Sequence, residues 1–99
     1  MSAPTQQSNS NKITLPDAQA LAQASKLSIK LNKPIDFYFY IDSCRNGCSI
    51  VSNDGDKVLY KSNDEHTSPI KNTYQVASEY LVVTENTIYI VSKNTTVRN

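Results

Sequence analysis

The chain has 99 residues, which suits one domain with a modest core. Ten Lys and Arg balance nine Asp and Glu, so no overall field would steer the protein onto nucleic acid or an anionic membrane. No apolar run approaches the roughly 18 residues of a membrane span, and the amino terminus lacks the basic and apolar regions of a signal peptide. We therefore expect an intracellular protein without a membrane segment.

Residues 1–12 are rich in Ser, Gln, Asn and Thr and offer little apolar surface to bury. Ordering such a segment costs conformational entropy that its own contacts would not repay. We expect a flexible amino-terminal arm here, with an arm that orders on a partner as the alternative. A single domain at residues 13–92 and a polar, frayed tail at residues 93–99 would complete the chain.

A helix is predicted to begin close to residue 14. Thr14 can cap its amino terminus, Pro16 suits a first turn that needs no amide donor, and Asp17 suits the positive end of the dipole. From residue 18 onward strand-like and helical spacings of apolar residues compete. The polar residues favour a helix, because at about 100° per residue they form one narrow strip. This strip consists of Gln19, Gln23, Lys26 and Lys30. Pro34 should end the helix.

Residues 35–42 have strand propensity at nearly every position. Strand alternation would give the core one face, made of Ile35, Phe37, Phe39 and Ile41. The other face would carry Tyr38 and Tyr40 between Asp36 and Asp42. Because tyrosine buries its ring and keeps its hydroxyl near water or a partner, this second face should be wet or lie in an interface.

Both glycines of the chain lie in dipeptides typical of hairpin turns, Asn46-Gly47 and Asp54-Gly55. A two-residue turn at Asp54-Gly55 would place Val51 opposite Val58. It predicts short strands at about residues 48–52 and 57–61.

A polar segment at residues 62–69 reads as the longest loop. Three further strands are predicted at residues 71–77, 79–84 and 87–92. The last turn would pair Leu81 with Ile90. The predicted fold is therefore α+β: an amino-terminal helix packed on a meander of about six antiparallel strands. A sheet that curls into a small barrel is the alternative.

No catalytic motif, phosphate-binding loop or zinc pattern is present, so we expect no enzyme activity, no cofactor and no metal. Cys44 and Cys48 are expected to be free thiols, although a three-residue turn between them would make them cross-strand neighbours able to bridge. His66, the only histidine, lies in a hydrophilic segment typical of a surface loop. Ser68 precedes a proline and is a candidate phosphorylation site.

The remaining hypotheses concern binding. Aromatic side chains on a sheet anchor protein interfaces, so Tyr38 and Tyr40 predict a protein partner or self-association, with an open sheet edge as a further surface. The alternative is a single-stranded nucleic-acid module that uses the sheet aromatics with Lys26, Lys30 and Lys33. Nucleic acid is disfavoured because Asp36 and Asp42 flank the tyrosines and would repel a phosphate backbone.

Three phrases of the sequence are Leu31-Asn32-Lys33-Pro34-Ile35, Glu65-His66-Thr67-Ser68-Pro69-Ile70 and Val83-Thr84-Glu85-Asn86-Thr87-Ile88-Tyr89-Ile90-Val91. They resemble phrases in small uncharacterised proteins encoded by large nucleocytoplasmic DNA viruses. The resemblance spans residues 15–92. It implies a protein of the host cytoplasm or the virion, and it favours a structural, virion-associated component.

Overall fold

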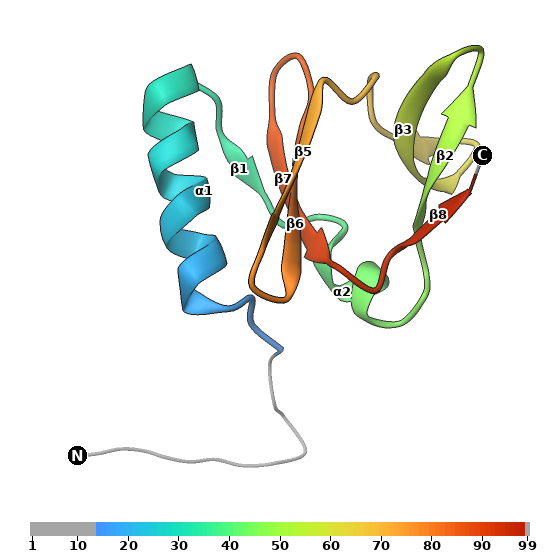
Figure 1. The fold of residues 1–99 in the computed structure, drawn as a ribbon. Helices are drawn as coiled ribbons and strands as arrows, with labels where there is room; N and C mark the ends of the chain where they lie inside the picture. The colour runs from blue at the N-terminus through green and yellow to red at the C-terminus, as the bar shows by residue number, and fades with distance from the viewer. Residues whose placement is uncertain (1–13, 99) are drawn as a thin grey trace.

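The computed structural model describes residues 14–98, and the arm predicted at residues 1–12 lies outside them (Figure 1). Two helices and eight strands form within the described part. In chain order they are α1 (Ala18–Leu31), β1 (Ile35–Asp36), α2 (Tyr40–Cys44), β2 (Ser49–Asn53), β3 (Asp56–Ser62), β4 (Glu65–His66), β5 (Asn72–Val76), β6 (Glu79–Val83), β7 (Ile88–Ser92) and β8 (Thr96–Arg98).

The predicted amino-terminal helix is confirmed as α1, but Thr14 does not cap it. Asp17 is the N-cap, and its carboxylate accepts a hydrogen bond of 2.7 Å from the backbone N–H of Gln19. The helix ends at Asn32, which adopts the left-handed conformation with φ 55° and donates its N–H to the carbonyl of Ser28. An aspartate directly before the first helical residue satisfies an orphan amide, whereas Thr14 lies too far upstream to reach one.

Sheet A has the strand order β1-β7-β6-β5. The antiparallel hairpin β6–β7 has the predicted register, with Leu81 opposite Ile90. β5 pairs with β6 in a second antiparallel hairpin. Strand β1 joins as a parallel neighbour of β7, so the sheet is not a pure meander.

Sheet B has the order β4-β3-β2-β8 and contains the predicted Asp54-Gly55 hairpin, with Val51 opposite Val58. Both turn residues have positive φ, 54° and 88°, as a two-residue type I′ turn requires. Two expectations are wrong here. Residues 62–69 are not all loop, because β4 pairs with β3, and the tail at residues 93–99 is not frayed over its described part, because β8 pairs in parallel with β2.

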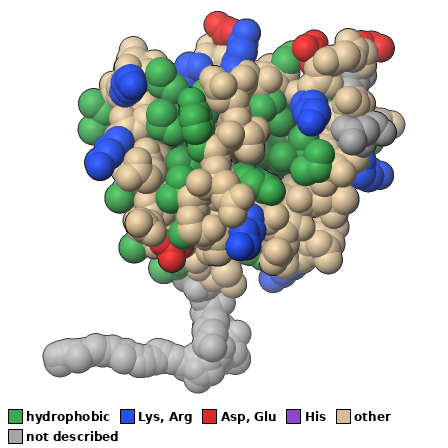
Figure 2. Space-filling view, in the orientation of Figure 1, with side chains coloured by type: hydrophobic (Ala, Val, Ile, Leu, Met, Phe, Trp, Pro, Cys, Tyr) green, Lys and Arg blue, Asp and Glu red, His purple; other side chains and the backbone are tan. Residues whose placement is uncertain are grey.

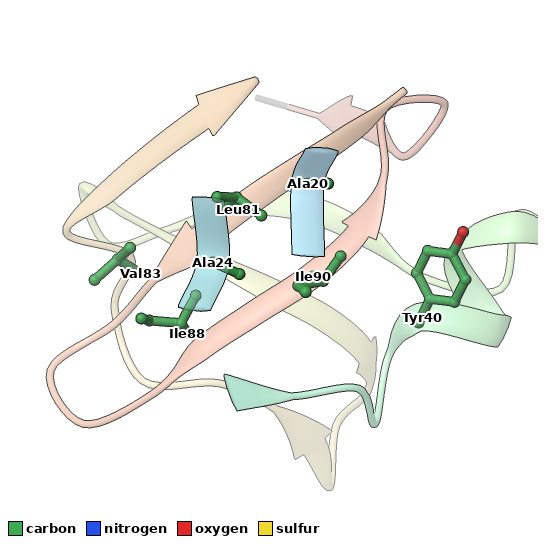
Figure 3. Packing of buried hydrophobic residues seen from close by; sticks show 7 residues of the cluster. All are labelled: Ala20, Ala24, Tyr40, Leu81, Val83, Ile88 and Ile90. Atoms are coloured by element: carbon green, nitrogen blue, oxygen red, sulfur yellow. The ribbon is translucent and has the colours of Figure 1, made fainter. Parts of the chain in front are cut away.

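The molecule has three layers, in which α1 covers one face of sheet A and sheet B packs against the other (Figure 1). Neither sheet closes into a barrel within residues 14–98. Figure 3 shows how Ala20 and Ala24 of α1 allow the helix to approach the sheet closely. The sheet side of this cluster consists of Leu81, Val83, Ile88 and Ile90. A second buried cluster lies between the sheets and consists of Phe39, Cys48, Ile50, Leu59, Val82 and Val91.

The strand predicted at residues 35–42 is wrong beyond Asp36. The carboxylate of Asp36 accepts a 2.8 Å hydrogen bond from the backbone N–H of Tyr38 and turns the chain. Helix α2 follows, and the N–H of Gly47 closes its end on the carbonyl of Asp42 at 2.7 Å. Because α2 occupies residues 40–44, the hairpin predicted at Asn46-Gly47 does not form.

Candidate protein-interaction surface

Helix α2 separates the two tyrosines that were predicted to share one exposed face. Tyr38 is 55% exposed, whereas Tyr40 is 4% exposed. Tyr38 lies in the turn before α2, and Tyr40 is the first residue of the helix, so the strand alternation that would have kept both on the same side is absent. Only Tyr38 is therefore available to a partner, and the prediction of Tyr40 as an interface residue is wrong.

Tyr40 instead belongs to a buried polar cluster around Glu79. Its hydroxyl donates a 3.1 Å hydrogen bond to Oε2 of Glu79, while Oε1 accepts 3.0 Å from the backbone N–H of Asp17 and 3.2 Å from the hydroxyl of Ser78. Burial raises the pKa of Tyr40 above its ordinary value, and hydrogen bonds with Cys44 and Glu79 act in the same direction. One carboxylate thus joins the start of α1, the start of β6 and helix α2.

An apolar groove of about 360 Å³ lies between the segment that leads into α1 and the start of α2. Its lining residues are Thr14, Leu15, Pro16, Leu21, Phe37, Tyr40 and Ile41. Three of the large side chains remain accessible to solvent: Leu15 is 72% exposed, Phe37 47% and Ile41 41%. Phe37 and Ile41 were predicted to be core residues. They are exposed because the turn and α2 leave only Phe39 of that predicted face fully buried.

A network of charged side chains holds Tyr38, which lies between Phe37 and the start of α2. Its hydroxyl donates to the carboxylate of Glu65, and Nζ of Lys61 lies 5.4 Å from its ring centroid. The same Nζ lies 3.1 Å from the carboxylate of Asp42 and 3.6 Å from that of Glu65. The hydrogen bond to Glu65 raises the pKa of Tyr38. The exposed ring is thus fixed by partners from β3 and β4.

The three lysines of the nucleic-acid hypothesis do not form one set. Nζ of Lys33 donates a 2.7 Å hydrogen bond to the carbonyl of Thr84, directly after β6. Lys26 and Lys30 lie exposed on α1. Since Tyr38 contacts Lys61 and not a lysine of α1, the structure brings no predicted tyrosine together with a predicted lysine.

His66 lies in β4, exposed, with its ring stacked on Tyr60 at a centroid distance of 6.3 Å. The two rings border a cavity of about 260 Å³ that Val51, Ser52, Val58 and Asn63 also line. Within residues 14–98, no three His, Cys, Asp or Glu side chains gather closely enough to hold a metal ion. Over the same residues, no helix has the length and apolar character needed to cross a membrane.

Ser68 is exposed, so its predicted modification stays a prediction. Cys44 and Cys48 are free thiols, the first exposed and the second buried, as expected for unbridged cysteines. Burial raises the pKa of Cys48 to about 11.

Sequence reasoning missed two features of this region. Leu15 lies between Thr14 and Pro16 in the segment predicted to begin the helix, and no periodicity indicates that it lines a groove. Glu79 did carry a signal, because it is a carboxylate beside a run of strand residues whose other members are apolar or aromatic.

The chain matches no protein-family model, no curated protein and no solved structure. The resemblance to viral proteins therefore stays a prediction.

Proposed function

We propose that this chain is a small non-enzymatic protein-interaction module that binds a partner through the apolar groove. The observation that carries the proposal is the exposure of Leu15, Phe37 and Ile41 around one depression. Clustered apolar side chains in a concave site supply the buried centre on which most protein interfaces depend. The resemblance to viral proteins would make the partner a component of a virion or of an infected cell.

The charges beside the apolar groove indicate the chemistry of the partner. Asp17, Asp36 and Asp42 each lie next to a groove residue in the chain. Asp42 pairs with Lys61, whereas the ion pairs formed within residues 14–98 include neither Asp17 nor Asp36. A partner segment that places an apolar side chain in the groove and Lys or Arg beside these two carboxylates would complement the site.

A selection of displayed peptides against the purified chain tests this proposal. We expect enriched peptides with a large apolar residue flanked by Lys or Arg. The double substitution Phe37→Ser and Ile41→Ser should weaken their binding by about tenfold or more, because anchor residues of this kind contribute about 2 kcal/mol.

Ile29→Ser provides the matched control. Ile29 is 84% exposed on α1 and does not line the apolar groove, so this change removes an exposed apolar side chain elsewhere. Peptides that bind the groove variant as tightly as the native chain would contradict the proposal.

A further inference from the structure

A second groove, of about 420 Å³, runs between α1 and the outer strand β5. Gln19, Gln23 and Leu27 line it from the helix, and Tyr74, Gln75 and Val76 line it from the strand. Leu81 of β6 forms its floor. Figure 2 shows hydrophobic side chains gathered between the helix and sheet A on this face. We call it the α1/β5 groove.

Strand β5 differs from the other outer strands of the two sheets. It has five residues, whereas β1 and β4 have two each and β8 has three. Short length and charged residues are two means by which proteins protect exposed sheet edges from pairing. β5 has neither, because Asn72, Thr73, Tyr74, Gln75 and Val76 are all uncharged. Among the described residues it pairs only with β6, so backbone donors and acceptors remain along its outer edge.

The side chains of β5 that face α1 favour an added strand at this edge. Tyr74 lies opposite Leu81 in the sheet register, so both lie on the helix-covered face. Val76 packs on the same cluster as Leu27. A strand added beyond β5 would place alternate side chains over this apolar strip and would obtain backbone hydrogen bonds from β5.

The helix side of the groove is positively charged. Lys26 and Lys30 fall on the same narrow strip of α1 as the groove residues Gln19 and Gln23, at about 100° per residue. Both lysines are exposed, and the ion pairs of residues 14–98 include neither. β5 contributes no charge, and the carboxylates of Asp17 and Glu79 lie beside the start of α1. The two ammonium groups therefore make the groove positive along the later turns of α1.

We propose that the α1/β5 groove binds an extended acidic protein segment, which adds to sheet A as a strand beside β5. One apolar side chain of the segment sits over Leu27 and Val76, and its Asp or Glu residues face Lys26 and Lys30. This site is separate from the apolar groove of the proposed function, which has carboxylates beside it and favours a basic partner.

A displayed library of seven-residue peptides tests this proposal on the full chain. We expect a class of peptides without proline that combines β-branched residues with Asp or Glu. In titrations of the isotopically labelled chain followed by nuclear magnetic resonance, these peptides should shift the amide signals of residues 72–76 and protect them from hydrogen exchange. Replacing a central residue by proline removes a backbone donor and should abolish binding.

Charge reversal supplies the decisive variant. Lys26→Glu with Lys30→Glu should weaken the binding of the acidic peptides by about tenfold and remove its salt dependence, because the new carboxylates repel the peptide's own. Both changes lie on the solvated face of the helix, so the fold should tolerate them. Lys26→Ala with Lys30→Ala gives the same direction if the reversed chain does not fold. Phe37→Ser with Ile41→Ser should leave this binding unchanged, so the two proposals can fail separately.

Four outcomes would overturn the strand-addition proposal. In the first, the library yields no acidic class of peptides. In the second, the acidic peptides shift the amide signals of residues outside β5. A dimer that forms through β5 in light scattering would make a second copy of the chain the occupant. An oligonucleotide of deoxythymidines that competes at Lys26 and Lys30 at about 50 mM salt would favour nucleic acid instead.

Discussion

Two segments of this molecule are similarly rich in aromatic and β-branched residues but form different structures. Residues 72–92 form the hairpins β5–β6–β7, in which each strand pairs with its neighbour in the chain. Residues 35–44 form two residues of strand, a turn and the short helix α2. The first segment makes its main hydrogen bonds between its own strands. The second adds side-chain contacts with distant parts of the chain to its local turn and helix hydrogen bonds.

The contacts of α2 show how this helix depends on distant parts of the chain. The hydroxyl of Ser43 accepts a 2.8 Å hydrogen bond from the backbone N–H of Ser92, at the end of β7. Tyr40 donates to Glu79, and Asp42 pairs with Lys61 of β3. A helix of five residues is too short to persist on its own propensity. Its conformation therefore follows from the packed strands around it, while the hairpins follow from local pairing and turn chemistry.

Phe39→Ala should have the largest effect, because its ring fills the space between the two sheets. The ring packs edge-on against Tyr89 at a centroid distance of 5.5 Å. A loss of about 4 kcal/mol in the free energy of unfolding is expected from urea denaturation, through the lost burial and the cavity that remains. Phe37→Ala, at the exposed position two residues earlier, is the control and should cost much less. Equal losses for the two variants would contradict the packing described here.

Glu79→Ala should destabilise the protein by about 2 to 3 kcal/mol, because the backbone N–H of Asp17 and the hydroxyl of Tyr40 lose a buried acceptor. Hydrogen exchange should show faster opening of residues 40–44 than of the β6–β7 hairpin. Tyr40→Phe removes only one of these donors, and about 1 kcal/mol is expected. If α2 kept its protection in Glu79→Ala while the hairpin lost it, the dependence of α2 on distant partners would be wrong.

The difference between the two segments also explains what the sequence could predict. The register of β6–β7 follows from alternation together with a short polar turn, and both signals lie within a few residues of each other. The alternation at residues 35–42 is equally regular. It is overridden because the carboxylate of Asp36 turns the chain and distant strands provide the partners of α2.

Parallel pairing was the other feature beyond prediction. β1 meets β7, and β2 meets β8, across long stretches of chain that leave no local signal. The candidate site could be predicted only in part for the same reason. Tyr38 was correctly predicted to be exposed, but the apolar groove depends on how α2 sits beside Leu15, which no spacing of residues encodes.

Alanine substitutions at the two glycines should distinguish a hairpin turn from the end of α2. Gly55 in the β2–β3 turn has φ 88° with no heavy atom within 4 Å of a built Cβ, so Gly55→Ala costs about 1 kcal/mol through backbone conformation alone. A Cβ at Gly47 would lie 3.2 Å from the carbonyl oxygen of Asp42. Its cost would come from contact with the end of α2.

Asn is the matched replacement in thermal unfolding, because it adopts positive φ more readily than Ala. Gly55→Asn should be better tolerated than Gly55→Ala, whereas Gly47→Asn should be no better than Gly47→Ala. The reverse order at either position would contradict the assigned cause.

The last expected effect is confined to alkaline pH and concerns the pH dependence of stability, through Cys48 behind α2. Burial raises the pKa of this thiol from 9.0 to about 11, so between these values the folded chain retains a proton that the unfolded chain releases. The sign follows directly: this contribution is fully present below pH 9 and decreases as the pH rises toward 11. The raised pKa of Tyr40 acts in the same direction at higher pH.

Urea denaturation at several pH values should therefore show a smaller decrease in the free energy of unfolding for Cys48→Ala than for the native chain. The comparison uses the change with pH, so it holds whatever the stability of the variant at neutral pH. Equal slopes for the two proteins would mean that Cys48 is more accessible to water than its position between the sheets indicates.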